Sequence, residues 1–152
     1  MDGIAGAIPA GGAIIAFRGA YAFLSNAYDT TVRFEGADYP TVEHAYLAAR
    51  TTDEAARAPV RRAATPHEAR RLGYRLIPRD DWEHVRVTVM WELVEQKFRR
   101  HPEFAERLLA TGQDVLVNGG GDAFWGVSGL RGANYLGRIL MGVRAELAAS
   151  PP

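Results

Sequence analysis

The sequence of 152 residues contains no cysteine and a single lysine, Lys97, beside 17 arginines. Without cysteine, the chain can form no disulfide, thiol nucleophile or thiolate metal site. The formal net charge is zero, with 18 basic and 18 acidic residues, so no overall field draws the protein to nucleic acid or to an anionic membrane. A local basic cluster can still bind phosphate. Because hydrophobic residues make up 47% and charged residues 24%, the composition is that of a folded globular protein.

The sequence also lacks the usual patterns of metal sites and membrane segments. No two histidines stand at HxH or HxxxH spacing, so a histidine-based metal site is not expected. The apolar stretch from Ile4 to Phe17 is interrupted by glycine and proline and has no positively charged start. It therefore predicts neither a signal peptide nor a membrane span. We expect a cytoplasmic protein that does not contact membranes.

The length predicts one compact domain. Residues 1–13 are rich in glycine and alanine and are expected to form a loose lead-in, and 14–150 a single domain. Short apolar or alternating runs predict strands at 14–17, 31–34 and 115–117. Apolar periodicity predicts helices at 42–50, 66–73, 82–100, 102–110 and 134–148. The predicted fold class is α+β: a mainly helical single domain with a few short strands.

Helix starts are marked by capping residues. Thr41 is the expected N-cap of the first helix, and Thr65-Pro66-His67-Glu68 has the form of a capping box with proline at the first helical position. Gly73 is the expected stop of that second helix. Asp80 or Asp81 is expected to cap the long helix that follows.

Three segments carry polar or glycine-rich residues that core packing does not explain: 17–26, 39–46 and 119–134. The third has six glycines and ends at a predicted helix start. Glycines let backbone N–H groups approach a ligand, and a helix start attracts phosphate, with Arg131 as a further phosphate partner. The alternative is a flexible surface loop. Trp125 within it argues for packing or stacking on something flat.

Single residues in these segments each allow two interpretations. Glu43 and Arg50 are seven positions apart on one helix and are expected to face the same space. Either could instead be an ordinary surface residue. Asp122 could simply shape a turn, and Trp82 could anchor the core rather than stack on a ligand.

In their order, the motifs closely resemble the NADAR family, also called YbiA-like, over 17–147. The residues that carry the resemblance are FRGAYAFLSNAY (17–28), FEGADYPTVEHAYLAAR (34–50), ATPHEARRLG (64–73), DDWEHVRVTVM (80–90), QKF (96–98), LLATG (108–112), DAFWG (122–126) and GANYLGRILMGVR (132–144).

The resemblance implies an N-glycosidase that cleaves a bond between ribose C1 and nitrogen. Its substrates would be ADP-ribose adducts of guanine in nucleic acid, NAD-like compounds or phosphoribosylamino-pyrimidines of riboflavin synthesis. The implied partner is thus a small ADP-ribosyl or phosphoribosyl molecule or an ADP-ribosylated base, with no cofactor and no metal. One version of this activity is an antitoxin-like role that reverses base ADP-ribosylation.

The resemblance also assigns the site residues. Glu43 is the first candidate for the carboxylate that stabilises the oxocarbenium-like transition state, and Asp122 is the second carboxylate. Arg50 is placed beside them as an electrostatic clamp. The implied substrate-binding residues are Arg18, Gly19, Ser25, Asn26, His44, Trp82, Trp125, Gly126, Arg131 and Asn134. Of these, the arginines would hold phosphates, the tryptophans would stack on rings, and Ser25, Asn26 and Asn134 would bind ribose hydroxyls or order the pocket.

The chain departs from the family at two positions. Many members have lysine where this chain has Arg50, and an acidic residue where it has Asn118. A lysine can form an imine with an opened ribose, whereas arginine stays protonated and cannot. If imine chemistry is required, either Lys97 performs it or the chain is a non-catalytic module that binds ADP-ribose or NAD. We favour hydrolysis led by the carboxylate of Glu43.

Overall fold

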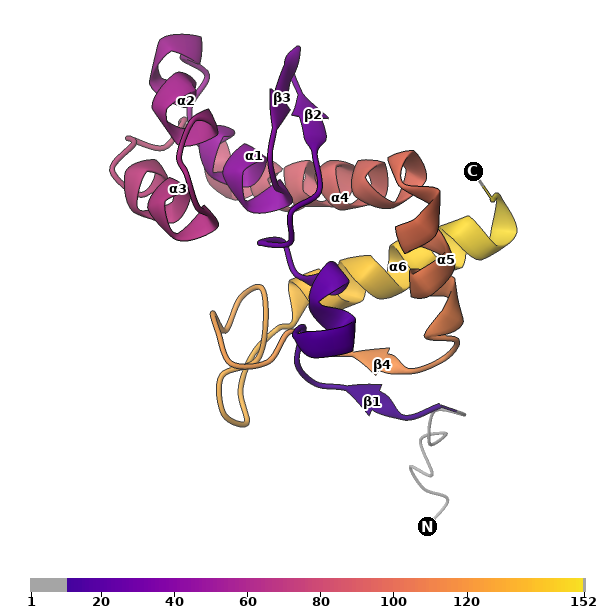
Figure 1. The fold of residues 1–152 in the computed structure, drawn as a ribbon. Coiled ribbons are helices and arrows are strands. Elements are labelled where there is room, and N and C mark those ends of the chain that lie inside the picture. The colour runs from indigo at the N-terminus through magenta and orange to yellow at the C-terminus, as the bar shows by residue number, and fades with distance from the viewer. Residues whose placement is uncertain (1–10, 152) are drawn as a thin grey trace. The chain divides into compact units, whose positions relative to one another are not determined.

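The computed structural model describes residues 11–151 and divides the chain into two compact units (Figure 1). Among the described residues, unit 1 comprises 11–24 and 102–151, and unit 2 comprises 25–101. Most of the expected lead-in at 1–13 lies outside the described residues, and the single domain stays a prediction. Helices account for about 51% of the described residues, and the strands among these residues are few and short, which confirms the mainly helical α+β class.

Unit 2 begins with a β-hairpin of β2 (Val32–Phe34) and β3 (Ala37–Tyr39), which pair antiparallel with Val32 opposite Tyr39. The turn at Glu35-Gly36 has positive φ at both residues, 45° and 87°, as a two-residue type I′ hairpin turn requires. Four helices follow: α1 (Val42–Ala48), α2 (Glu54–Arg61), α3 (Pro66–Gly73) and α4 (Trp82–Arg100). Figure 1 shows the hairpin beside α1 and α4.

Helix α1 is at the centre of unit 2 and contacts the hairpin and the other three helices. The apolar residues Val42, Ala45 and Tyr46 of α1 and its C-cap Ala49, spaced at i, i+3, i+4 and i+7, are buried. Burial of this stripe drives the packing, since apolar area removed from water is the main favourable term in folding. The Thr41 side chain accepts the backbone N–H of His44, which confirms the predicted N-cap.

Helix α3 has the predicted cap but a different end. Thr65 Oγ1 accepts the backbone N–H of Glu68, as expected for a capping box. Gly73 is not a terminating residue outside the helix, because it is the last helical residue and Tyr74 is the C-cap. A Cβ on Gly73 would lie 2.7 Å from Leu47 Cβ, so glycine is required there for the close approach of α1 and α3.

Helix α2 is absent from the sequence prediction, because Pro59 lies inside it and is typical of a helix break. The helix forms with Asp53 as N-cap, whose side chain accepts the backbone N–H of Ala55. The long helix α4 is confirmed, but the side chain of its N-cap, Asp81, makes no capping hydrogen bond and binds the Arg79 guanidinium instead.

Unit 1 contains β1 (Ala13–Ile14), the 3₁₀-helix η1 (Gly19–Leu24), α5 (Pro102–Ala110), β4 (Val115–Leu116) and α6 (Tyr135–Ala149). Strands β1 and β4 are parallel, with Ile14 opposite Leu116 (Figure 1). The apolar face of α6 is buried and consists of Leu136, Ile139, Leu140, Val143 and Leu147. Among the described residues, no helix is both long enough and apolar enough to cross a membrane.

Candidate active site

Glu43 lies in the first turn of α1, and its backbone is fixed from outside the helix. Its N–H donates to the carbonyl of Asn26 at 3.0 Å, and Thr41 caps the next N–H of the helix. Its side chain is 13% exposed, and Oε1 accepts a hydrogen bond from Arg70 Nε on α3 at 3.1 Å. The carboxylate is therefore oriented by a charged neighbour while part of it stays open to solvent.

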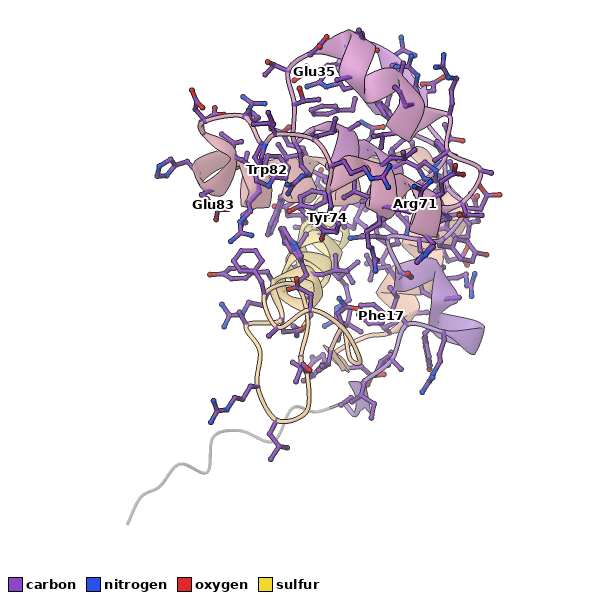
Figure 2. All side chains as sticks on the ribbon, turned by 90° about the vertical axis from the view of Figure 1, so that its left-hand side faces the viewer. Phe17, Glu35, Arg71, Tyr74, Trp82 and Glu83 are labelled. Atoms are coloured by element: carbon purple, nitrogen blue, oxygen red, sulfur yellow. The ribbon has the colours of Figure 1, made fainter. Side chains whose placement is uncertain are left out.

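Arg50 follows the end of α1 and also interacts with residues of α3 and its cap. Its Nε donates to the carbonyl of Gly73 at 3.2 Å, and its guanidinium carbon lies 5.1 Å from the centre of the Tyr74 ring. Tyr74, labelled in Figure 2, is 59% exposed. Since Glu43 and Arg50 both contact the segment 70–74, they lie on the same side of α1, as their spacing predicts.

The structure corrects the predicted roles of two residues in unit 2. His44 is 1% exposed, and its Nε2 lies 3.1 Å from the carbonyl of Ala63, an acceptor, so Nε2 carries the proton. Its Nδ1 then accepts from the Thr41 hydroxyl at 2.7 Å, which leaves no ring nitrogen for a substrate. Trp82 is 3% exposed and packs on Tyr46 with ring centres 5.1 Å apart, so it is a core anchor rather than a stacking platform.

Ser25 and Asn26 order the start of unit 2. The Ser25 hydroxyl accepts the backbone N–H of Ala27 at 3.1 Å, which shapes a tight turn. Asn26 is 9% exposed, and its side-chain amide contacts Met90 Sδ at 3.4 Å. Of the two predicted roles, ordering the pocket is the one these contacts support.

Lys97 on α4 is 1% exposed, and its Nζ donates to the carbonyl of Ser25 at 2.9 Å. Burial lowers the pKa of the Lys97 amine from 10.5 to about 7, because an ammonium loses hydration in the interior. The alternative in which Lys97 attacks an opened ribose is not supported, because the amine is buried and already hydrogen-bonded.

In unit 1, Asp122 builds the first turn of the segment 119–134, called here the glycine-rich loop. Its Oδ1 accepts the backbone N–H groups of Phe124 at 2.6 Å and of Trp125 at 3.0 Å. The side chain is exposed, so the second oxygen can still reach a ligand. The turn-shaping interpretation is thus supported, and a catalytic role for Asp122 stays a prediction.

The glycine-rich loop is tied to the start of α6. The carbonyl of Phe124 accepts the N–H of Tyr135 at 3.1 Å, and that of Trp125 accepts the N–H of Leu136 at 3.0 Å. These hydrogen bonds order 124–125, whereas 120–123 and 128–132 are exposed, so the alternative of a flexible surface loop stays open for those parts. The expectation that the helix start attracts phosphate is also corrected, because its first two N–H groups are already bonded.

Asn134 and Gly126 stabilise the contact between the glycine-rich loop and the start of α6. Asn134 has φ of 53°, and its side chain accepts from the N–H of Asn118 and donates to the carbonyl of Leu116, both at 2.9 Å. A Cβ on Gly126 would lie 2.0 Å from the carbonyl oxygen of Asn118. The contacts of Asn134 support the ordering role and leave ribose binding a prediction.

Alanine at Gly126 should destabilise the protein, whereas alanine at Gly121 should not. Gly126→Ala forces the loop away from Asn118 and should cost about 1–3 kcal/mol. A Cβ on Gly121 would meet no atom within 4 Å, so Gly121→Ala should change the free energy of unfolding by less than about 0.5 kcal/mol. Urea unfolding of both variants measures the difference. Equal effects would contradict the packing role of Gly126.

The remaining predicted residues of unit 1 are accessible. Arg18 and Arg131 are exposed and have no hydrogen bond or ion pair through their side chains within residues 11–151, so both are available to an anion. Gly19 is exposed with φ of 59° and begins η1. Trp125 is half-buried and meets the Phe124 ring edge-on, with centres 4.8 Å apart. Stacking of Trp125 on a base stays a prediction.

Metal ligation has no obvious place in the described part of the chain, 11–151, where no group of three or more His, Asp or Glu side chains is arranged to hold an ion.

Two residues of the site were not predicted. Arg70, which binds the Glu43 carboxylate, is 27 residues away in sequence, and no local pattern signals the pairing. Tyr74, under the Arg50 guanidinium, follows a helix that was expected to stop at Gly73. Both depend on the packing of α3 against α1.

The fold and these motifs together indicate the protein family. The sequence profile of the NADAR domain matches 16–148, and the chain belongs to this family. Among solved structures, the NMR structure of YbiA of Escherichia coli is similar, with a TM-score of 0.80, 36% identity, and coverage of 91% of this chain and 87% of YbiA. The predicted YbiA-like fold is thereby confirmed.

Named relatives give the similarity in sequence. N-glycosidase YbiA of E. coli K12 is 38% identical over 132 residues, which are 84% of this chain and 82% of YbiA. N-glycosidase Npun_R5314 of Nostoc punctiforme is 38% identical over 135 residues, 84% of this chain and 86% of that protein. A riboflavin biosynthesis protein of Vibrio vulnificus is 40% identical over 136 residues, 87% of this chain, but the match spans only 37% of that longer protein.

Proposed function

We propose that this protein is an N-glycosidase that hydrolyses the bond between ribose C1 and nitrogen in an ADP-ribosyl or phosphoribosyl compound. The family and the names of the relatives support the reaction type. The observation that carries the proposal is the Glu43 carboxylate, which is held by Arg70 on one side and is 13% exposed. A carboxylate held in this way is suited to act on a bound sugar.

The reaction requires stabilisation of positive charge at C1. As the C1–N bond breaks, its electron pair leaves with the nitrogen and the ribose becomes oxocarbenium-like. Glu43 stabilises that charge electrostatically and takes a proton from the attacking water. The water oxygen bonds to C1, and the nitrogen leaves as an amine or a free base once it is protonated. Asp122 is the candidate for the group that gives this proton.

The cationic side chains bind the anionic part of the substrate. Arg18 and Arg131 are exposed in unit 1 and have no carboxylate partner within residues 11–151, so they are candidates for the phosphates. Arg50 contributes a fixed positive charge in unit 2, on the same side of α1 as Glu43. Substrates of this class share a phosphorylated ribose, which is the part that arginine side chains would bind.

Two substrate classes fit this proposal. An ADP-ribosylated guanine base and a phosphoribosylamino-pyrimidine each present a ribose linked through C1 to nitrogen. The names of the Vibrio protein and of the chloroplast protein PYRR of Zea mays refer to riboflavin biosynthesis, which favours testing the pyrimidine. Cytoplasmic localisation stays a prediction, whichever of the two substrates the protein uses.

The second candidate function is a module that binds ADP-ribose or NAD without turnover. The observation that favours it is Arg50 itself: a guanidinium bonded to Gly73 and stacked near Tyr74 cannot act as an amine nucleophile. The two functions are separated by whether product is released, since both predict binding.

A turnover assay with purified protein tests the proposal. Guanine-ADP-ribosylated oligonucleotide, NAD and a phosphoribosylamino-pyrimidine are offered in parallel, and the released base, amine or sugar is quantified by chromatography. We expect release from at least one substrate. Tight binding of ADP-ribose with no release from any of the three would overturn the enzyme and support the binding module.

Hydrolysis led by Glu43 also predicts that borohydride traps no adduct. Arg50 cannot form an imine, and Lys97 is buried, so reduction during turnover should leave the protein mass unchanged. Arg50→Lys introduces an amine at the same position and is the matched comparison. Mass spectrometry gives the answer, and a reduced ribosyl adduct on the wild-type protein would contradict the mechanism.

A further inference from the structure

Lys97 carries a buried amine for which the proposed reaction has no direct use. It is the only lysine in the sequence and is 1% exposed. Its Nζ donates to the Ser25 carbonyl at 2.9 Å and lies 5.9 Å from the centre of the Tyr28 ring. No ion pair of Lys97 occurs within residues 11–151. Burying an amine costs free energy, and a single hydrogen bond to Ser25 offsets only part of that cost. The burial of Lys97 therefore calls for an explanation.

The Ser25 carbonyl belongs to a turn that makes two side-chain contacts with α4. It accepts the N–H of Tyr28 at 3.2 Å in addition to Lys97 Nζ. The side-chain amide of the next residue, Asn26, donates to Met90 Sδ at 3.4 Å. Met90 and Lys97 are seven positions apart, about two helical turns, so both residues that contact the turn lie on one face of α4.

The same turn holds the backbone of Glu43. The Asn26 carbonyl accepts the Glu43 N–H at 3.0 Å, one of the helix-start donors that α1 cannot satisfy internally. A path of adjacent contacts therefore runs from Lys97 through Ser25 and Asn26 to Glu43. All of these residues lie within unit 2.

We propose that Lys97 is a positioning residue that sets the location of the Glu43 carboxylate through the Ser25-Asn26 turn. The proposal rests on the proposed function, because it concerns the catalytic carboxylate. The hydrogen bond does not depend on the charge of Lys97, since a neutral amine also donates. Loss of the amine frees the turn, and a shift of about 1 Å at a catalytic group can cost about 10²-fold in rate.

Lys97→Met tests the proposal, because methionine keeps the length of the side chain and removes the donor. Arg100→Met, an exposed cation on the same helix, is the control. On the substrate found by the turnover assay, we expect kcat to fall about 10- to 100-fold in Lys97→Met, with KM within about twofold of wild type. In a Glu43→Gln background, Lys97→Met should cause no further loss, since the two act as one unit.

Amide hydrogen exchange gives a second result that needs no substrate. In Lys97→Met the Glu43 amide should exchange at least about tenfold faster, with the amide of Leu93 in the core of α4 unchanged. A folded Lys97→Met with unchanged kcat and unchanged Glu43 exchange would overturn the proposal. So would an equal loss of kcat in the wild-type and Glu43→Gln backgrounds.

The proposal can still be tested if the wild-type protein shows no turnover or if Lys97→Met does not fold. If the wild-type protein turns over none of the three substrates, the proposed function fails, while the exchange experiment still tests the positioning. If Lys97→Met does not fold, the Glu43 amide of the wild-type protein supplies the result. Protection similar to that of the interior of α1 supports the proposal, and exchange at the rate of an unstructured amide overturns it.

Discussion

Replacing Glu43 by glutamine should lower kcat about 10²–10⁴-fold, the largest effect expected of any single substitution in the site. Glutamine has nearly the same shape, so it keeps the contact with Asn26 through the backbone and fits beside Arg70. It removes only the negative charge and the ability to accept a proton from water. KM should change much less than kcat, because the lost interaction is strongest in the transition state.

Two controls separate the charge of Glu43 from the loss of its ion pair. Arg70→Met removes the orienting guanidinium but leaves the carboxylate, so it should retain more activity than Glu43→Gln. Glu92→Gln makes the same chemical change at an exposed position on α4 and should leave kcat unchanged. Steady-state kinetics on the substrate from the turnover assay measures all three. If Glu43→Gln keeps wild-type kcat, the mechanism led by this carboxylate is wrong.

The stability of the protein should rise with pH above neutrality because of Lys97. The pKa of its amine is lowered by burial from 10.5 to about 7. Between these values the unfolded chain binds a proton at Lys97 that the folded protein does not bind, so the free energy of unfolding increases with pH. Below pH 7 both states hold the proton, and this pH dependence disappears.

The expected size follows from the two pKa values. A single group in this condition contributes a slope of about 1.4 kcal/mol per pH unit, and the whole difference corresponds to at most about 5 kcal/mol. Tyr39 sets the upper limit of the usable range: burial raises the pKa of its hydroxyl, so its ionisation in the unfolded chain opposes folding once the pH exceeds its ordinary value of 10.0. The useful window is therefore about pH 7 to 9.5.

Urea unfolding at several pH values across this window measures the effect. The free energy of unfolding of the wild-type protein should increase relative to that of Lys97→Met by about 2–3 kcal/mol between pH 7 and 9. Arg100→Met should follow the wild-type curve, because its side chain is exposed. Parallel curves for wild type and Lys97→Met would show that the Lys97 pKa is close to normal in the folded protein.

The secondary structure of the chain was predictable where its signals are local. Thr41 and Thr65 cap helices as expected, since a capping side chain bonds an N–H only three residues away. The hairpin turn at Glu35-Gly36 is also encoded locally. Helix α2 was not predicted, because Pro59 is a local signal against a helix, and the packing of α2 on α1 and α3 overrides it.

The candidate site was predictable in part. The spacing of Glu43 and Arg50 predicted that they face the same space, and both contact the segment 70–74, although Arg50 lies beyond the end of α1 at Ala48. The roles of His44 and Trp82 were misassigned, since burial depends on what packs over a residue and not on its neighbours in sequence. The same holds for the start of α6, where the N–H groups expected to be free are bonded to the carbonyls of Phe124 and Trp125.

The sequence by itself determined the family, the helix boundaries marked by caps and the residue types available for chemistry. Tertiary structure decided which of those residues are accessible and what orients them. Arg70 reaches Glu43 across 27 residues and Lys97 reaches Ser25 across 72. The physical reason is range: capping and periodicity act within about four residues, whereas burial and ion pairing depend on segments that meet only when the chain folds.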